Sequence, residues 1–354
     1  MRISLLILSR CFGGAERHVL DLARQLRGHG LQVQLIGRHD GWLEPTALVD
    51  SGVRVDLLPT LLRGRALRRL LRDFEPQLLH CHLGKAARLS SSARLGLPCI
   101  ASLHGHYKHK DYRHLHGLIC VAPWQRQGIH RDYPGRVALI PNFLHSARPH
   151  SQAGQDIRQR LGIPADALVI GSVGRFAPEK GMDLLLQAFA QAQLDNAYLL
   201  LLGDGGEMPR LRAMAPPRVV FTGWVADPLP YYAAFDLFAS AARAESFGLA
   251  LLQAMQLALP VIATRTPGPA WLLSQGGGRL TPLEDPQALA EGLRQLAASA
   301  DLRQQLGEQA IAAASRFSPG QIVPRLIEFY QEVSGQPAPD PTGQNTGLRD
   351  RLSP

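Results

Sequence analysis

Short apolar runs of strand length alternate with amphipathic segments of helix length, and this alternation limits the folds open to the chain. In residues 1–150 we predict seven strands, at Ile3–Leu8, Leu31–Ile36, Val53–Leu58, Gln77–Cys81, Pro98–Leu103, Leu118–Val121 and Val137–Ile140. After the first of them, apolar residues recur at helical spacing over Ala15–Arg27. Near-continuous apolar strands separated by helices are typical of a parallel sheet that helices cover on both faces.

The same alternation restarts in the second half of the chain. The strands expected there are Leu168–Val173, Tyr198–Leu202, Val219–Thr222, Leu237–Ser240 and Val261–Ala263. The helices expected there are Gly181–Ala192, Gly248–Leu257, Pro286–Ala298, Leu302–Arg316 and Gln321–Val333. The pattern therefore predicts an α/β fold of two doubly wound, Rossmann-like domains that face each other across a cleft.

The domain boundary is expected where the alternation stops. Pro141 and Asn142 followed by the polar stretch His145–Gln155 indicate a linker. We expect a first domain at 1–150 and a second at 151–334, with the last helix able to pack back on the first domain. Residues 335–354 are rich in Pro, Gly and polar residues, which predicts a disordered tail.

Length and composition exclude several classes of protein. The chain has 354 residues, which corresponds to about two domains at roughly 150 residues each. Its apolar runs are far shorter than the ~18 residues of a membrane helix, and the start of the sequence lacks the pattern of a secretory signal. The four cysteines form no CxxC pair. We therefore expect a cytoplasmic protein with free thiols.

Charge is distributed unevenly between the two halves. Residues 1–150 hold 22 Lys and Arg against 10 Asp and Glu, whereas residues 151–354 hold 16 and 19. All 13 histidines precede Ser151. This asymmetry suggests that the first half meets an anionic partner, which is a membrane surface, a phosphorylated acceptor or a nucleic acid.

The basic charge is densest in one leucine-rich segment. Its arginines are Arg63, Arg65, Arg68, Arg69 and Arg72, and leucines lie between them. Such a helix either lies on anionic lipid or packs its leucines on the core as an ordinary surface helix, and the sequence favours neither. Lys108, Lys110 and Arg113 extend the positive charge around the expected acceptor side.

Glycine-rich turns after two of the expected strands suggest anion binding. Gly13 and Gly14 follow the first strand and open a helix, so backbone N–H groups there can approach an anion, although an ordinary tight turn explains them equally well. In the second half, Arg175 and Lys180 lie between a strand and a helix among glycines. Two fixed cations there would stabilise the charge that develops on a pyrophosphate leaving group, whereas an isolated Arg and Lys are more often solvated surface cations.

A carboxylate precedes a helix in the second half. Glu245, just before the helix that begins at Gly248, can accept hydrogen bonds from sugar hydroxyls while free helix N–H groups face a phosphate. Spacing alone favours the alternative that Glu245 only caps the helix.

Together these segments resemble the retaining glycosyltransferases of the GT-B fold, in the large family four that uses nucleotide-activated sugars. The resemblance covers almost all of residues 1–334 and depends on the order and spacing of six segments. They are GGAERHVLDLARQL from Gly13, LLHCH from Leu78, SLHGH from Ser102, GRFAPEKG from Gly174, LLGDGG from Leu201 and ESFGLALLQAM from Glu245.

The resemblance implies roles for individual residues. His104 would contact the donor sugar, Arg175 and Lys180 would grip its diphosphate, and Glu245 would lie near the sugar hydroxyls. Transfer in such enzymes keeps the anomeric configuration through same-face attack, without a covalent enzyme intermediate. The donor-binding positions, with no metal or other cofactor, would be Gly13, Gly14, Gly203, Phe247, Gly248, Leu249 and Gln253.

The chain departs from the family pattern in the donor site. The second glutamate of the family's paired motif, which binds the ribose hydroxyls, is replaced by Gln253, and Ala258 stands where Gly is common. An amide accepts a hydroxyl hydrogen bond without the added strength of a charge. The substitution therefore predicts weaker donor binding with the chemistry retained.

A metal ion is not expected in the site. No two aspartates are separated by a single residue, so the Asp-x-Asp site of metal-dependent glycosyltransferases is missing. His80 and His82 alternate onto one face of a strand, and with His104 they would supply three zinc ligands. A satisfied or substrate-facing set of histidines is the favoured interpretation.

The leading hypothesis is a transferase that moves a sugar from a nucleotide diphosphate sugar, with UDP as the favoured nucleotide, to a growing glycan. The basic first half suggests an anionic or membrane-held acceptor, such as a lipopolysaccharide core or a lipid-linked polysaccharide precursor, at the cytoplasmic face of the inner membrane. The alternative is a catalytically poor nucleotide-sugar-binding protein. Nucleic-acid binding, suggested by the sequence pI near 9.8, lacks any zinc-finger spacing or aromatic-rich RNA motif.

Overall fold

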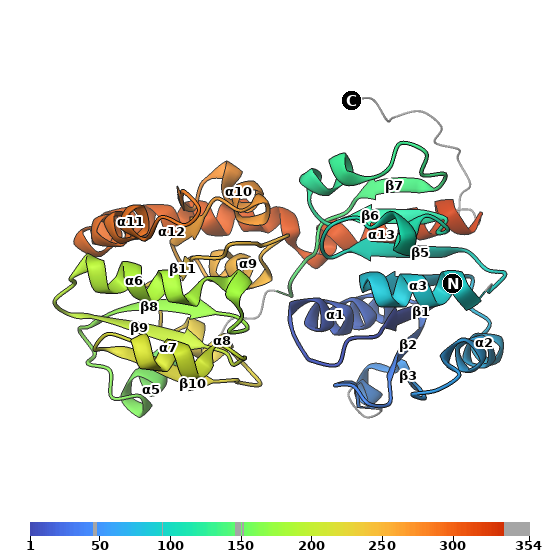
Figure 1. Ribbon diagram of the computed structural model, residues 1–354, viewed down its shortest axis with the longest axis horizontal. Helices are drawn as coiled ribbons and strands as arrows, with labels where there is room; N and C mark the ends of the chain where they lie inside the picture. The colour runs from blue at the N-terminus through green and yellow to red at the C-terminus, as the bar shows by residue number, and fades with distance from the viewer. Residues whose placement is uncertain (45–47, 94, 146–149, 151, 336–354) are drawn as a thin grey trace.

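The computed structural model describes residues 1–354 except 45–47, 94, 146–149, 151 and 336–354. It consists of two lobes, each a parallel sheet flanked by helices (Figure 1). The predicted fold class, two doubly wound α/β domains, is confirmed. The predicted linker lies partly, and the predicted tail almost wholly, outside the described residues.

The first lobe contains all seven strands that the sequence predicts there. They are β1 (Arg2–Ile7), β2 (Gln32–Arg38), β3 (Arg54–Leu58), β4 (Leu78–His82), β5 (Cys99–Leu103), β6 (Gly117–Cys120) and β7 (Arg136–Leu139). Their order in the sheet is β3-β2-β1-β4-β5-β6-β7, and every pair is parallel. The direction of strand order reverses between β1 and β4, and ligands of such sheets bind at this switch point.

The second lobe repeats this topology with one strand fewer. Its strands are β8 (Leu168–Val173), β9 (Ala197–Leu202), β10 (Val219–Gly223), β11 (Leu237–Ser240), β12 (Val261–Thr264) and β13 (Gly278–Thr281). They lie in the order β10-β9-β8-β11-β12-β13. The strand β13 was not predicted, because it is a four-residue edge strand that begins at a glycine and has little apolar character.

The helices cover both faces of each sheet. In the first lobe they are α1 (Gly14–Gly28), α2 (Arg63–Phe74), α3 (Leu83–Ala93) and α4 (His109–Tyr112). In the second half they are α5 (Ala153–Arg160), α6 (Met182–Ala192), α7 (Met208–Met214), α8 (Leu229–Tyr232), α9 (Leu249–Gln256), α10 (Pro267–Leu272), α11 (Pro286–Ala298), α12 (Ala300–Ala314) and α13 (Pro319–Ser334).

Alternating residues of each buried strand enter different cores. In β1, Leu5 packs with α1 on one face, whereas Leu6 packs with α2 and α3 on the other. Since side chains alternate along a strand, a strand that is covered on both faces must be apolar throughout. This is why the strand predictions in the first lobe succeeded.

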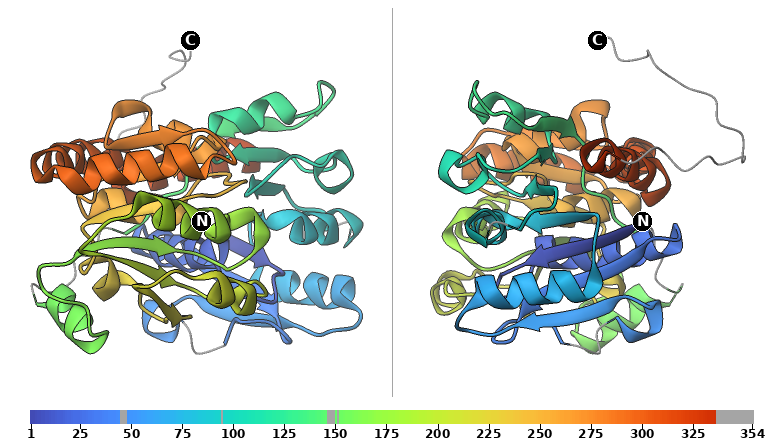
Figure 2. Two further views of the ribbon diagram at one scale, coloured as in Figure 1. Left: turned by 60° about the vertical axis from the view of Figure 1, so that its left-hand side comes forward. Right: turned by 90° about the vertical axis from the view of Figure 1, so that its right-hand side faces the viewer.

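The last helix belongs in space to the first lobe. After the second lobe is complete, α13 crosses back and packs on the first sheet (Figures 1 and 2). Its buried side chains join the core formed by β1, β2 and α1; they are Ile322, Val323, Leu326, Phe329 and Tyr330. A segment remote in sequence therefore contributes to the interior of the N-terminal lobe.

The lobes contact each other through the segment after β6 and through the end of α9. Trp124 Nε1 donates to the carbonyl oxygen of Ser246 at 3.0 Å, and Gln256 Nε2 donates to that of Leu144 at 3.2 Å. No helix among the described residues is both long and apolar enough to cross a membrane.

Candidate functional site

Two glycines bring the loops after β8 and β9 into contact. Gly203 has φ +139°, and a Cβ atom there would lie 1.8 Å from the carbonyl oxygen of Gly174. The N–H of Gly174 donates to the carbonyl oxygen of Leu202 at 3.0 Å. A side chain at position 203 is sterically excluded, so Gly203 can take part in binding only through its backbone.

The loop after β8 is also bound to the loop after β11. The N–H groups of Arg243 and Ala244 both donate to the carbonyl oxygen of Glu179, at 2.9 and 3.1 Å. Gly181 has φ +62°, and a Cβ atom there would lie 1.9 Å from the carbonyl oxygen of Ala241. This approach fixes the short 3-10 segment Pro178–Lys180 against the start of the segment that leads to α9.

These contacts place Lys180 beside Glu245. The Nζ atom of Lys180 is 2.6 Å from Oε2 of Glu245, and the two side chains are only 27% and 22% exposed. A cation and a carboxylate that share a partly buried position interact more strongly than a surface pair. Together they offer a donor to phosphate oxygens and an acceptor to hydroxyl groups. The tertiary structure thus unites two of the predicted site residues.

Arg175 has a different environment. Its Nη2 atom pairs with Oε1 of Glu179 at 2.5 Å, and its side chain is 65% exposed. Exposed ion pairs contribute about 0.2–1 kcal/mol, so Arg175 can leave Glu179 for a stronger anion at little cost. The two cations that the sequence predicts to act as one pair therefore have different partners in the structure, Glu179 for Arg175 and Glu245 for Lys180.

The start of α9 offers backbone donors. Its N-cap is Gly248, with φ +99° and no side chain of its own to cap the helix. The N–H of Phe247 lies 3.4 Å from Oε1 of Glu245, while the Phe247 ring is buried against Trp271 and Phe317. Position 247 can therefore contact a ligand only through its backbone, next to free helix N–H groups.

The first lobe presents its first glycine loop to the same place. A Cβ atom on Gly14 would lie 3.3 Å from Cδ1 of Leu249, the first residue of α9. Gly13 is the N-cap of α1 in extended conformation. The loop after β1 thus meets the start of α9, and the predicted binding positions of both lobes face each other.

His104 lies just after the carboxyl end of β5; it is partly exposed and lies next to the buried histidines His18, His80 and His82. Its Nε2 atom is 3.0 Å from Nδ1 of His82, and its ring centroid is 6.1 Å from that of His18. Burial lowers the pKa of His104 to about 3 and that of His18 to about 4. Burial also holds the pKa values of His80 and His82 well below the usual range. At neutral pH these rings are uncharged and act through hydrogen bonds.

The structure does not arrange His80, His82 and His104 as three free ligands for a zinc ion. Both ring nitrogens of His80 are already engaged, one with Tyr330 Oη at 2.7 Å and the other with Ser102 Oγ at 2.9 Å. In the part of the chain that the structure describes, no three His, Cys, Asp or Glu side chains come together as metal ligands.

The stability of the protein should fall as pH is lowered from about 6.5. Because the folded-state pKa values of the four histidines lie below the unfolded value, the unfolded chain binds more protons in this range. For His18 alone the loss at pH 5 is about 2 kcal/mol. Melting temperatures measured from pH 7.5 to 5 should decline, with the same decline in His114→Gln, which removes an exposed histidine. A constant melting temperature would contradict the buried neutral cluster.

The side-chain amide of Gln253 is buried. The residue is 7% exposed, and its Nε2 atom has no hydrogen-bond partner in the described part of the chain. Ala258, two residues after the end of α9, has φ +57°. Glycine adopts this left-handed conformation without strain, so a glycine would fit this position more easily than Ala258 does.

One ion pair that stabilises the site could not be predicted from the sequence. The guanidinium of Arg243 binds both carboxylate oxygens of Asp183, at 2.7 and 3.0 Å, and also Oε1 of Glu284 at 2.7 Å. Arg243 holds the pKa of Asp183 below its usual range. This bidentate pair ties the start of α6 to the segment before Glu245. No sequence signal joins residues 60 positions apart.

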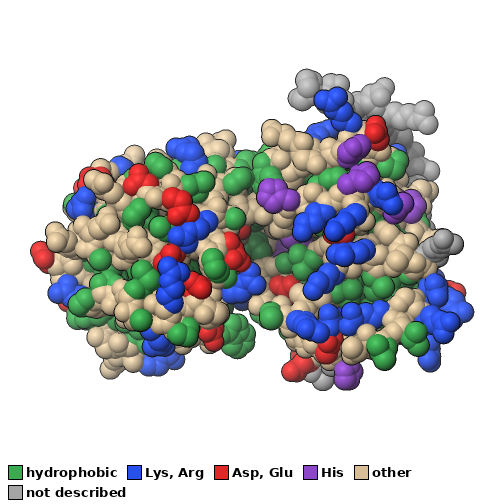
Figure 3. All heavy atoms as spheres, in the orientation of Figure 1, with side chains coloured by type: hydrophobic (Ala, Val, Ile, Leu, Met, Phe, Trp, Pro, Cys, Tyr) green, Lys and Arg blue, Asp and Glu red, His purple; other side chains and the backbone are tan. Residues whose placement is uncertain are grey.

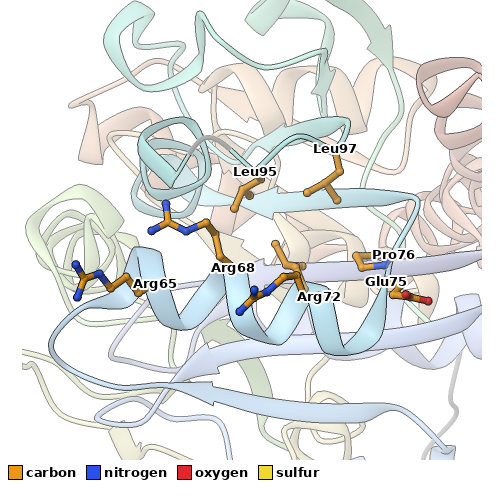
Figure 4. Close-up of a pocket in the computed structure, with 8 residues that line it drawn as sticks. Arg65, Arg68, Arg72, Glu75, Pro76, Leu95 and Leu97 are labelled. Atoms are coloured by element: carbon orange, nitrogen blue, oxygen red, sulfur yellow. The ribbon is translucent and has the colours of Figure 1, made fainter.

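A second feature lies away from the cleft, on α2. Leu67 and Leu71 are packed in the core, so the leucines of α2 do not form a free apolar face. A groove remains beside the helix (Figure 4), lined by Arg65, Arg68, Leu71, Arg72, Glu75, Pro76, Leu95 and Leu97. Leu61 and Leu62, just before α2, are 77% and 69% exposed. Lys and Arg side chains gather on the visible face of this lobe, whereas the second lobe shows both signs (Figure 3).

Comparisons with known proteins match both halves of the chain. The family model of glycosyltransferase family 4 matches residues 12–148, and that of glycosyl transferases group 1 matches residues 167–299. The lipopolysaccharide core biosynthesis glycosyltransferase LpsE of Rhizobium meliloti is 30% identical over 310 residues, which are 84% of this chain and 89% of that protein. LpsD of the same organism is 29% identical over 335 residues, 90% and 95% of the two chains.

Solved structures share the fold. HepE of Anabaena, solved in complex with UDP and glucose, superposes with a TM-score of 0.83 at 23% identity, over 94% of this chain and all of that one. WaaG, a glycosyltransferase involved in lipopolysaccharide biosynthesis, gives a TM-score of 0.72 at 17% identity, over 95% of this chain and all of WaaG. These likenesses establish the GT-B arrangement of the two lobes.

Proposed function

The chain belongs to the glycosyl transferases group 1 family, and from this premise we propose that it transfers a sugar from a UDP-sugar donor to a glycan acceptor in cell-surface polysaccharide biosynthesis, with UDP as the leaving group. The observation that carries the proposal is the Lys180–Glu245 pair, held opposite the Gly13–Gly14 loop of the other lobe. The family membership supplies the reaction class, and the geometry supports a donor site between the lobes.

In this proposal the second lobe holds the donor. Lys180, joined by Arg175 once it leaves Glu179, binds the diphosphate and stabilises the charge that develops as the anomeric C–O bond breaks. Glu245 accepts hydrogen bonds from sugar hydroxyls, and the N–H groups at Leu249 face the distal phosphate. The uncharged imidazole of His104 donates a hydrogen bond to the sugar.

We further propose retention of the anomeric configuration by same-face attack, without a divalent ion. Support for metal independence comes from the missing Asp-x-Asp pair and from the cations that take over the ion's electrostatic role. A UDP-linked donor is supported by the UDP complex of HepE. A lipopolysaccharide-core acceptor is supported by the similarity to LpsE, LpsD and WaaG.

A thermal-shift screen of UDP, GDP, ADP and CDP tests the donor site. A nucleotide that binds only the folded protein raises the melting temperature, and we expect the largest rise with UDP. Turnover of the matching UDP-sugar then separates an enzyme from the alternative, a nucleotide-sugar-binding protein without activity. A rise with UDP but no transfer or hydrolysis would favour the binding protein, and no rise with any nucleotide would overturn the proposal.

Gln253→Glu should tighten binding of UDP. A carboxylate at this position accepts a charge-assisted hydrogen bond from a ribose hydroxyl, which is roughly twice as strong as that of an amide. We expect the dissociation constant to fall about fivefold, measured by isothermal titration calorimetry. Gln187→Glu is the matched control, since Gln187 is an exposed glutamine on helix α6 of the same lobe and the change adds the same charge. Equal affinities of parent and Gln253→Glu would remove position 253 from the ribose site.

We also propose that the first lobe rests on an anionic membrane surface through the arginines of α2 and the exposed Leu61 and Leu62. The leucines of the helix itself are used in the core, so the contact is chiefly electrostatic. Each Lys or Arg near such a surface contributes about 1 kcal/mol. Peripheral attachment at the cytoplasmic face of the inner membrane would bring a lipid-held acceptor to the cleft.

The double variant Arg65→Glu and Arg72→Glu should bind anionic vesicles at least about tenfold more weakly. Co-sedimentation with phosphatidylglycerol vesicles measures this, with phosphatidylcholine vesicles as the uncharged reference. The control reverses Arg279 and Arg294, two exposed arginines of the second lobe, and so has the same net charge. Equal loss in both double variants would mean that net charge, and not α2, governs binding.

A further inference from the structure

A stack of histidines connects His104 to the interior of the first lobe. His80 and His82 alternate onto one face of β4, with ring centroids 4.2 Å apart. The ring of His82 in turn stacks on that of His104, at 5.3 Å between centroids. His80 and His82 are completely buried. The function proposed above uses His104 and leaves the two histidines behind it unexplained.

Hydrogen bonds fix the orientation of each ring in this stack. His80 lies between Ser102 Oγ and Tyr330 Oη, at 2.9 and 2.7 Å. Tyr330 comes from α13, the helix that returns from the second lobe, and is itself fully buried. His82 Nδ1 and His104 Nε2 form the outermost link at 3.0 Å.

A hydrogen bond between Nδ1 of His82 and Nε2 of His104 requires that one of these two nitrogens is protonated and that the other is not. Both rings are neutral because burial lowers their pKa values, and a neutral imidazole has one N–H donor and one acceptor nitrogen. The other nitrogen of His82, Nε2, is buried without a partner in the described part of the chain. A proton there would be an orphaned buried donor, which folded proteins rarely contain. The proton of His82 therefore belongs on Nδ1.

This assignment determines the state of His104. Its Nε2 atom accepts from His82, so its own proton must lie on Nδ1. Nδ1 of His104 has no hydrogen-bond partner among the described residues, yet it is not among the fully buried unpartnered atoms. It is therefore open to a ligand.

We propose that His82 is a positioning residue that fixes His104 in the Nδ1–H form, so that His104 offers a neutral N–H donor to an oxygen of the bound sugar. His80, held by Ser102 and Tyr330, supports the ring of His82 from behind. The proposal deepens the function proposed above and depends on it for the identity of the ligand. The tautomer itself is a property of the unliganded protein.

Nitrogen-15 NMR of histidine-labelled, unliganded full-length protein tests the tautomer directly. The signals of His104 are assigned by their loss in His104→Gln. We expect the coupling pattern of an Nδ1-protonated ring for both His82 and His104. A pattern of Nε2 protonation at His104 would overturn the proposal, because His82 would then be the acceptor.

Two variants of His82 link the tautomer to function. His82→Asn keeps an amide N–H near the Nδ1 position, whereas His82→Leu removes the donor. With UDP-glucose as the probe, we expect His82→Leu to lower kcat of donor hydrolysis at least tenfold and to leave the affinity for UDP, which lacks the sugar, within twofold. His82→Asn should recover most of kcat, and the control His114→Gln should match the parent.

The outcomes separate the two proposals. Equal loss of kcat in His82→Asn and His82→Leu, or a parallel loss of UDP affinity, would show a merely structural role and overturn the positioning role. Failure of the parent to bind UDP would instead count against the proposed donor, while the NMR measurement would still decide the tautomer.

Discussion

Lys180→Ala is expected to lower kcat of sugar transfer by about 10²–10³-fold, the range seen when one group that stabilises transition-state charge is removed. Lys180 is the cation that the structure holds in place, 2.6 Å from Glu245 and largely shielded from water. Its removal takes a positive charge from the leaving diphosphate and leaves the carboxylate of Glu245 without its partner. The change in kcat should exceed the change in KM, because the negative charge grows as the bond breaks.

Two variants show whether position or charge matters. Lys180→Arg keeps the charge in a different shape and should recover part of the activity. Arg175→Ala should cost less than Lys180→Ala, because Arg175 is 65% exposed and must first leave Glu179. Steady-state kinetics with and without a chelator complete the comparison. Activity that survives Lys180→Ala but disappears on chelation would show that a divalent ion, not this lysine, neutralises the diphosphate.

Gly181→Ala is expected to destabilise the fold and to abolish most activity together. The φ of +62° costs an L-residue about 1–2 kcal/mol. The new Cβ would also lie 1.9 Å from the carbonyl oxygen of Ala241, so the loops must move apart. We expect a loss of about 3–5 kcal/mol, seen as a melting temperature roughly 5–15 °C lower. Separation of the loops would also move Lys180 away from Glu245.

Gly320→Ala is the matched control for this prediction. Gly320 lies in the first turn of α13 without a positive φ, and a Cβ atom there would have no neighbour within 4 Å. Alanine there should stabilise the protein by about 0.5–1 kcal/mol and leave kinetics unchanged. If Gly181→Ala melted at the temperature of the parent with full activity, the close approach of the two loops would not be a requirement of the site.

The architecture was predictable because its signal is local and repeated. The strands of the first lobe are apolar throughout, since each contributes side chains to two cores, as Leu5 and Leu6 do. Strand-length apolar runs separated by helices specify parallel sheets wherever they occur. The exception is β13, where Gly278 opens a short edge strand with one face poorly covered. Because the side chains of β13 are less buried than those of the central strands, its sequence is less apolar and does not stand out as a strand.

The sequence predicted which residues form the candidate site but not which of them contact each other. Lys180 and Glu245 follow β8 and β11, two neighbouring parallel strands of the second sheet, and Gly13 follows β1 of the first sheet. Ligands of such sheets bind beyond the carboxyl ends of the strands, and motif order picked out these residues as candidates. Their partners were not predictable in the same way. The sequence placed Arg175 and Lys180 at a diphosphate and Glu245 at sugar hydroxyls, with a helix cap as the alternative for Glu245. Only the structure shows that Glu245 pairs with Lys180 and that Arg175 pairs with Glu179.

Amino-acid order alone thus determined the two α/β lobes, the edge that carries the site and the unequal charge of the halves, because each follows from residues close together in the chain. The tertiary structure decided which polar groups meet, as in Arg243 with Asp183 and Tyr330 with His80. Residues that are 60 and 250 positions apart produce no periodic pattern in the sequence from which their contact could be predicted. Their pairing depends on how helices and loops pack, above all on the return of α13 to the first lobe.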